Sequence, residues 1–209
     1  MHWGHLSVKP GALTLTLLLL LSPLSYAETP PEDIRQLFND GLTYLNQGDA
    51  IRAARSLRRV MEINPSIPQA HNALGIAYLR QERYNKAIES FKNAVELDSQ
   101  YAEGYFNLGS AYLRGDYEAE YSQKYFSKTL EVDPNFPNVY ASLGWLHLEK
   151  TNDFHAAETS FSKALKQNPQ DIRSLYGIGI AYIFINKPEK TIFSISKLRA
   201  MDQEQLAKT

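Results

Sequence analysis

The chain contains no cysteine among its 209 residues, which excludes disulfide bridges, thiol catalysis, thiolate metal sites and an amino-terminal lipoprotein cysteine. Neither sign of charge is in excess, because 22 Lys and Arg face 23 Asp and Glu and no block of like charge occurs. This balance offers no basic surface to nucleic acid and no polybasic patch to a membrane. The 44% of apolar residues is nevertheless enough to build a buried core.

Long apolar runs are also scarce, and the longest one lies near the amino terminus, from Ala12 to Leu21. A helix that crosses a bilayer needs about 20 apolar residues, whereas this run is half as long and Pro23 interrupts it. Lys9 precedes the run, and a small-residue ending at Ala27 follows it, which is the layout of a secretory signal. We therefore predict cleavage after Ala27 and an exported, periplasmic protein that is soluble after cleavage; an uncleaved signal that anchors the chain is the alternative.

The remainder of the chain repeats itself with a period of 34 or 35 residues. A glycine recurs at each period, followed three residues later by Tyr or His, then by a small residue and, four positions on, by a large apolar one. The glycines are Gly41, Gly75, Gly109, Gly144 and Gly179, and the large apolar residues are Leu57, Phe91, Phe126, Phe161 and Ile195. A fixed period of this length indicates stacked supersecondary units.

Each period contains two stretches in which apolar residues recur at three- and four-residue spacing, separated by a short polar turn. This spacing predicts two amphipathic helices per unit. Asn64, Asp133 and Asn168 each stand before a proline, where the second helix of a unit should end. Two units hold one extra residue, which we expect near the turn between their helices.

The pattern Gly-x-x-Tyr, then Ala, then Phe, then Pro resembles the tetratricopeptide repeat. The resemblance implies an all-α fold, a right-handed superhelix or α-solenoid of helix–turn–helix units. Together with the signal-like segment at the amino terminus, it predicts a signal peptide at 1–27, a short leader at 28–33, a five-repeat domain at 34–205 and a tail at 206–209. The expected units are 34–67, 68–101, 102–136, 137–171 and 172–205.

The sequence offers little to a catalytic or metal site. His71, His147 and His155 occupy unrelated repeat positions, without the spacing of a helical metal pair. Serines show neither a nucleophile elbow nor a triad pattern, and carboxylates lie on predicted helix surfaces. We expect no enzyme activity, no cofactor, no metal, no nucleic acid and no small-molecule substrate.

In the family, partners bind the concave face that is lined by the first helix of each unit. The resemblance places thirteen candidate binding residues on this face: Phe38, Leu42, Asn72, Ile76, Arg80, Phe106, Ser110, Arg114, Trp145, Arg173, Tyr176, Ile180 and Phe184. Aromatic and Arg side chains predominate in binding hot spots. Leu45, Leu79, Leu113 and Leu148 also map to this face, but packing between helices explains them equally well.

These features together predict an adaptor of the cell envelope that binds a peptide or helix of a partner protein in the groove, during assembly of an envelope complex. The first alternative is a structural subunit that self-associates through the edges of the solenoid. Few residues follow Met201, so we expect Ile195 and Leu198 to be uncovered and the carboxy-terminal edge to contact another copy or a partner. A composite enzyme site shared with a partner ranks third.

Overall fold

The computed structural model describes residues 33–206. The chain divides into two units, Met1–Asp33 and Ile34–Thr209. The signal peptide predicted for 1–27, the leader up to residue 32 and residues 207–209 lie outside the described residues. Within residues 33–206, no helix combines the length and the apolar character that crossing a membrane requires.

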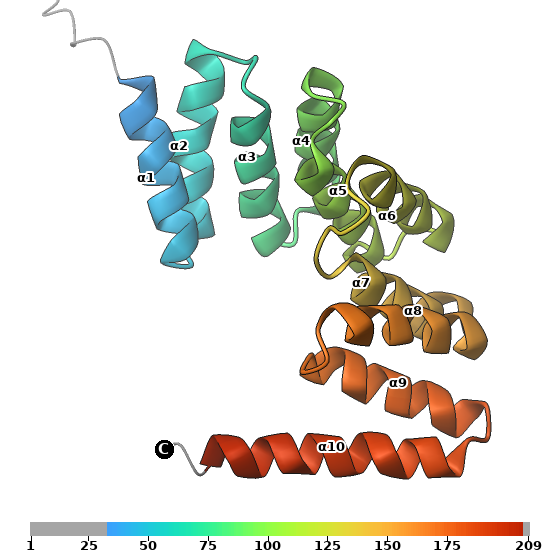
Figure 1. Cartoon of the computed structure of the whole chain (residues 1–209). Helices are drawn as coiled ribbons and strands as arrows, with labels where there is room; N and C mark the ends of the chain where they lie inside the picture. The colour runs from blue at the N-terminus through green and yellow to red at the C-terminus, as the bar shows by residue number, and fades with distance from the viewer. Residues whose placement is uncertain (1–32, 207–209) are drawn as a thin grey trace, which may run out of the picture. The chain divides into compact units, whose positions relative to one another are not determined.

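The second unit consists of helices, and its described residues form no strand. The α-helices are α1 (Ile34–Asn46), α2 (Ala50–Ile63), α3 (Pro68–Arg80), α4 (Tyr84–Leu97), α5 (Ala102–Arg114), α6 (Ala119–Val132), α7 (Val139–Leu146), α8 (Phe154–Gln167), α9 (Ile172–Phe184) and α10 (Pro188–Leu206). Each lies beside its neighbours in the chain, and short turns join them into hairpins (Figure 1). The predicted all-α solenoid of helix–turn–helix units is confirmed.

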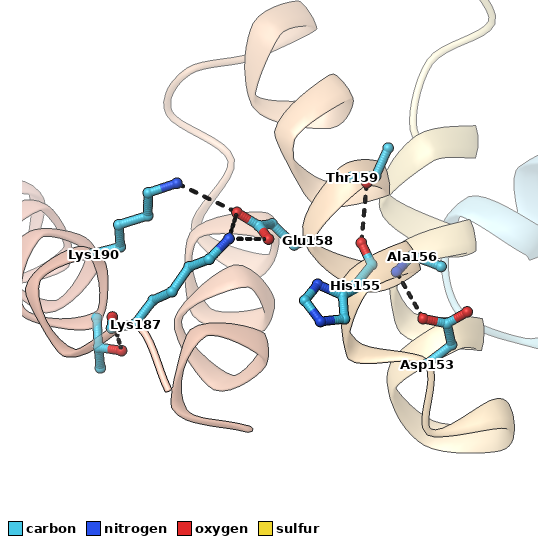
Figure 2. Close-up of polar contacts among 8 residues, drawn as sticks. Asp153, His155, Ala156, Glu158, Thr159, Lys187 and Lys190 are labelled. Carbon is cyan, nitrogen blue, oxygen red and sulfur yellow. Dashed lines mark hydrogen bonds and ion pairs between the residues drawn. The ribbon is translucent and has the colours of Figure 1, made fainter. Parts of the chain in front are cut away.

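The ends of the helices follow from local chemistry. Asp153 caps α8 by accepting a hydrogen bond of 2.9 Å from the backbone N–H of Ala156, which satisfies a donor that the first turn leaves free (Figure 2). Asn64 has an extended backbone, with φ at −144°, because the proline after it disfavours a helical conformation. Asp133 and Asn168 end α6 and α8 in the same way, as the sequence predicts.

The two extra residues are accommodated differently. In the third helix pair the turn lengthens, so that residues 115–118 join α5 to α6 where residues 81–83 join α3 to α4. In the fourth pair α7 continues into a π-helical turn, His147–Thr151, which takes up the insertion within the helix. Both insertions therefore lie beside the inter-helix turn, and the contact between the repeat glycine and its phenylalanine is preserved in both hairpins.

The core of each of the first four hairpins is a glycine packed against a large apolar side chain, which is an aromatic ring in the second, third and fourth. Phe91, Phe126 and Phe161 are completely buried. A Cβ atom added at Gly75 would lie 2.5 Å from a ring carbon of Phe91, and one added at Gly144 would lie 2.6 Å from Phe161. These glycines are therefore required by the close approach of the two helices rather than by an unusual backbone conformation.

Successive hairpins are joined by packing and by polar links. From α3 onward, each odd-numbered helix packs against the even-numbered helix before it and touches the preceding odd-numbered helix. The Gln81 side chain donates to the carbonyl oxygen of Ala50 at 2.8 Å. Lys187 donates to both carboxylate oxygens of Glu158, at 2.9 and 2.7 Å, and together with Lys190 it lowers the pKa of that carboxyl group (Figure 2).

The three histidines of the described residues lie in three different environments. His71 Nε2 lies 2.7 Å from the carbonyl oxygen of Pro65. His147 takes the place of the repeat tyrosine, and burial lowers the pKa of its imidazole. His155 is exposed. In the part of the chain that the structure describes, no cluster of three or more His, Asp or Glu residues could hold a metal ion.

The glycine contacts predict opposite effects for the same substitution at two repeat positions. Gly75→Ala should lower the free energy of unfolding by about 1–3 kcal/mol, because the buried Phe91 ring has no free space to move into. At Gly179 a Cβ would meet only Ser194 at 3.5 Å, an ordinary contact. Gly179→Ala should therefore leave stability unchanged or raise it by up to about 1 kcal/mol through helix propensity. Urea denaturation measures both, and equal destabilisation would contradict this packing.

Candidate functional site

A hollow opens on the side of the solenoid that is lined by the odd-numbered helices. Its volume is about 330 Å³. Residues from α3, α5, α7, α9 and the loops before α7 and α9 line it: Leu79, Phe106, Ser110, Leu113, Arg114, Asn138, Ala141, Ser142, Trp145, Asp171 and Arg173. Five of the thirteen predicted site residues, Phe106, Ser110, Arg114, Trp145 and Arg173, therefore meet in one place, which we call the inner groove.

Trp145 is the central side chain of the inner groove. Its ring meets the buried Phe161 edge-on, with centroids 5.5 Å apart, so the hairpin core holds it in place. On its other side it stacks on Tyr176 at 6.3 Å, and the Arg173 guanidinium lies 5.8 Å from its centroid. The indole Nε1 is buried and has no hydrogen-bond partner among the described residues. Trp145, Tyr176 and Arg173 thus form a cation–aromatic cluster across α7 and α9.

Phe106 forms a second aromatic cluster on α5. Its ring lies 5.8 Å from that of the buried Phe126 and 5.3 Å from that of Phe136. Phe136 stands in the loop before α7, outside the repeat positions that predict groove residues. A single aromatic residue within an otherwise polar loop is the signal by which the sequence could have revealed it.

The polar part of the inner groove contains both signs of charge. Arg114 and Arg173 are exposed guanidinium groups on α5 and α9. Asp171 accepts hydrogen bonds from the backbone N–H groups of Arg173 and Ser174, so its carboxylate serves as the cap of α9. Ser110 donates to the Phe106 carbonyl oxygen at 2.8 Å. The two arginines are therefore the groups best placed to bind an anionic side chain.

Three predicted site residues serve as connectors between repeats instead. Asn72 is only 3% exposed; it accepts from Asn107 Nδ2 at 2.9 Å and donates to Glu103 Oε1 at 3.1 Å. The guanidinium of Arg80 donates to the carbonyl oxygen of the preceding repeat's Leu45. Ile76 is half-buried between the buried apolar side chains of α1–α3 and those of α3–α5. These side chains are engaged in holding α3 against its neighbours.

The remaining candidates lie toward the two ends of the repeat array. In α1, Phe38 packs on the buried apolar side chains of α1, α2 and α3, and Leu42 is 36% exposed. In α9, Ile180 packs on the buried apolar side chains of the π-helical turn, α8 and α9. Phe184 stacks on Phe154 of the preceding hairpin, with centroids 4.2 Å apart. None of these four residues lines the inner groove.

Burial helps to distinguish the two interpretations of the four leucines, packing between helices and lining the concave face. Leu45, Leu79 and Leu148 are 6–8% exposed and belong to the buried apolar core between the helices. Leu113 is half-buried. Leu79 and Leu113 also reach the wall of the inner groove, so they contribute an apolar boundary to it while packing between helices.

Comparison with known proteins places this geometry among tetratricopeptide-repeat structures. A TPR-repeat family model matches residues 77–115, and a second tetratricopeptide-repeat model matches residues 137–171. No curated protein matches the chain.

Three solved structures illustrate the likeness. A crystal structure of MamA is 26% identical, with a TM-score of 0.71, and the alignment covers 81% of this chain and 97% of that one. A thermophilic TPR protein of Thermus thermophilus is 18% identical, with a TM-score of 0.67 and coverage of 83% and 94%. YrrB, described as a TPR protein with an unusual peptide-binding site, is 17% identical, with a TM-score of 0.64 and coverage of 83% and 89%.

At such identities the last two structures support the fold alone. The family models add independent evidence. The second match, residues 137–171, includes the Gly144–Phe161 contact of the fourth unit, and the first, residues 77–115, runs from the end of α3 through α5. Two segments of the chain, residues 77–115 and 137–171, therefore match tetratricopeptide-repeat models, within a fold that is similar to those of tetratricopeptide-repeat structures.

Proposed function

We propose that this protein is a non-catalytic interaction scaffold, which binds a peptide segment of a partner protein in the inner groove. The observation that carries the proposal is the joining of two aromatic clusters, around Phe106 and Trp145, with two exposed guanidinium groups, Arg114 and Arg173, in one hollow. Aromatic and Arg side chains around a pocket are the usual anchors of a protein interface.

The geometry indicates which peptide would fit. The hollow of about 330 Å³ is at the lower end of the range for ligand pockets, so it suits one large apolar side chain rather than an extended buried segment. The arginines on α5 and α9 favour a carboxylate beside that anchor, because a guanidinium binds a carboxylate through paired hydrogen bonds. An apolar residue with an adjacent Asp or Glu is the expected motif.

Known relatives are compatible with this function. YrrB is described as having a peptide-binding site, and tetratricopeptide repeats generally serve protein interaction. The neighbours do not specify the partner, because a fold is compatible with many functions and the site determines which one is performed. The choice of peptide therefore rests on the residues of the inner groove.

A peptide array tests the inner groove directly. Random peptides should be retained by the purified protein when they carry an aromatic or large aliphatic residue beside an acid. Arg114→Glu and Arg173→Glu should each weaken that binding at least about tenfold, since each replaces an attractive charge by a repulsive one. Both side chains are exposed, so the variants should keep the wild-type circular dichroism spectrum and urea midpoint.

Arg58→Glu on α2 is the matched control, because it makes the same charge change at an exposed position outside the inner groove. It should bind the selected peptides as the wild type does. Peptides that bind equally to all four proteins would show that the inner groove is not the binding site.

We further propose that the chain carries five tetratricopeptide repeats and works in the cell envelope, during assembly of an envelope complex. Five helix hairpins with the same glycine spacing support the first point, and the signal-like segment up to Ala27 supports the second. Residues 1–32 fused to alkaline phosphatase, which is active only after export, should give periplasmic activity and a mature chain that begins at Glu28. Cytoplasmic retention of the fusion would refute the envelope role.

The second candidate function is self-association through the carboxy-terminal edge. Ile183 on α9 and Ile192 on α10 are 63% and 67% exposed, whereas their repeat counterparts Leu79 and Ile88 are 8% and 7% exposed. Ile195 is 43% exposed, in line with the prediction for this edge. If the edge joins two copies, the mass measured by sedimentation should rise with concentration, and an Ile183→Glu, Ile192→Glu variant should remain monomeric. A wild-type mass that stays monomeric at every concentration would exclude this role.

A further inference from the structure

A second and larger hollow lies between α8, α9 and α10. Its volume is about 510 Å³, and most of its surface is apolar. Leu175 and Ile178 of α9 and Leu165 of α8 line it, and Phe193 of α10 stands at its side. Leu175 and Ile178 lie on the opposite side of α9 from Arg173 and Tyr176, by the 100° step of a helix. This hollow, the outer groove, is therefore separate from the inner groove.

Two departures from the repeat create the outer groove. The place of Leu175 is taken by ring side chains in the three preceding units, His71, Tyr105 and Tyr140, of which the two tyrosines are larger than leucine, and by Leu37 in the first unit. The smaller leucine leaves space beneath α10. At Phe193, where the preceding unit has the polar Thr159, the chain has an aromatic residue that is 67% exposed. Both changes make this one hollow deeper and more apolar.

The corresponding space in the third unit is filled by the chain itself. Tyr105 is 9% exposed there, and the ring of Tyr112 stacks on those of Tyr121 and Tyr125, at 5.0 and 5.5 Å between centroids. Ser194 holds the place of Tyr125 in the fifth unit. The repeat scaffold can therefore close this space with side chains, which makes its opening between α8 and α10 a property of these residues.

Lysines line both walls of the outer groove. Lys166 lies on α8, and Lys190 and Lys197 lie on α10; Glu189 is the one acidic residue among the residues that line it. Lys190 is 3.4 Å from Glu158, whose carboxylate is bound more closely by Lys187 (Figure 2). The outer groove therefore carries an excess of positive charge along an apolar floor.

The spacing of these charges discriminates between ligands. Lys190 and Lys197 are seven residues apart, which is about 10 Å along α10, with Phe193 between them. A fatty acid or lipid with a single anionic head needs cations gathered at one mouth. Charges spread along both walls instead match carboxylates on successive turns of a helix, whose apolar face would lie against the exposed ring of Phe193, above the buried Leu175 and Ile178.

We propose that the outer groove binds an acidic amphipathic helix of a partner protein. The apolar face of that helix packs against α9 and Phe193, and its flanking carboxylates pair with Lys166 on one wall and Lys190 and Lys197 on the other. This site is independent of the inner groove, so one protein can hold two different segments on opposite sides of α9.

The probe for this site is a helix-stabilised peptide of about 15 residues, with Leu at every third or fourth position and Glu along both flanks. A matched peptide carries Lys in place of every Glu, and oleate serves as the lipid arm. Fluorescence anisotropy should show saturable binding of the acidic peptide alone. Leu175→Tyr, which restores the ring found in the preceding units, should weaken it at least about tenfold, because the ring refills the hollow. Phe193→Glu should do the same without disturbing the fold, because this side chain is already exposed.

Charge reversal gives the decisive comparison. The probe also carries Leu beside Glu, the motif expected for the inner groove, so the comparison is made in an Arg114→Gln, Arg173→Gln background. That protein should still bind the acidic peptide, whereas adding Lys166→Glu and Lys197→Glu should abolish this binding and give binding of the Lys peptide. Equal binding of the acidic peptide to wild type, Phe193→Glu and the charge-reversed variant would overturn the proposal. So would saturable binding of oleate with no binding of the acidic peptide, or loss of the acidic peptide in the Arg114→Gln, Arg173→Gln background.

Discussion

The contact between a glycine on one helix and a large side chain on the next is the constraint on which the rest of the structure depends. Because Gly75, Gly109 and Gly144 carry no side chain, the rings of their partner phenylalanines lie directly against the helix backbone. The two helices of a hairpin therefore approach closely, with a ring that water does not reach. Every hairpin built this way presents the same faces of its first helix, one inward and one outward.

This constraint explains why the fold can be read from the sequence. A residue that must be glycine in a helix recurs visibly, because glycine is otherwise unfavourable there. Its period locates the hairpins, and a proline after Asn64, Asp133 or Asn168 locates the end of the second helix. The π-helical turn after α7 could not be predicted in the same way, because an added residue can lengthen either the turn or the helix at similar spacing.

The inner groove was only partly predictable, and the reason is physical. A repeat position determines which way a side chain points but not which partner it meets. The resemblance places Asn72 on the concave face, yet it is buried and hydrogen-bonded to Asn107 and Glu103 on the first helix of the next unit, so it joins repeats. Phe136 contributes to the aromatic surface from a loop that has no repeat position. Phe106 and Trp145 both line the inner groove, although Phe136 contacts the first ring and Tyr176 and Arg173 of α9 contact the second.

Departures from the repeat are therefore more informative about binding than the repeat itself. At positions where the units agree, the side chain is the one that the packing of the hairpin requires. Leu175 differs from the ring side chains of the three units before it, although the first unit also has a leucine there, and a hollow lies beside it. On the other side of the same helix, Tyr176 replaces the connector asparagine of the second unit and stacks on Trp145. Helix α9 therefore departs from the earlier units at positions on opposite faces, while its core side chains Ile178 and Ala181 stay buried, and each of these two faces borders one of the two hollows.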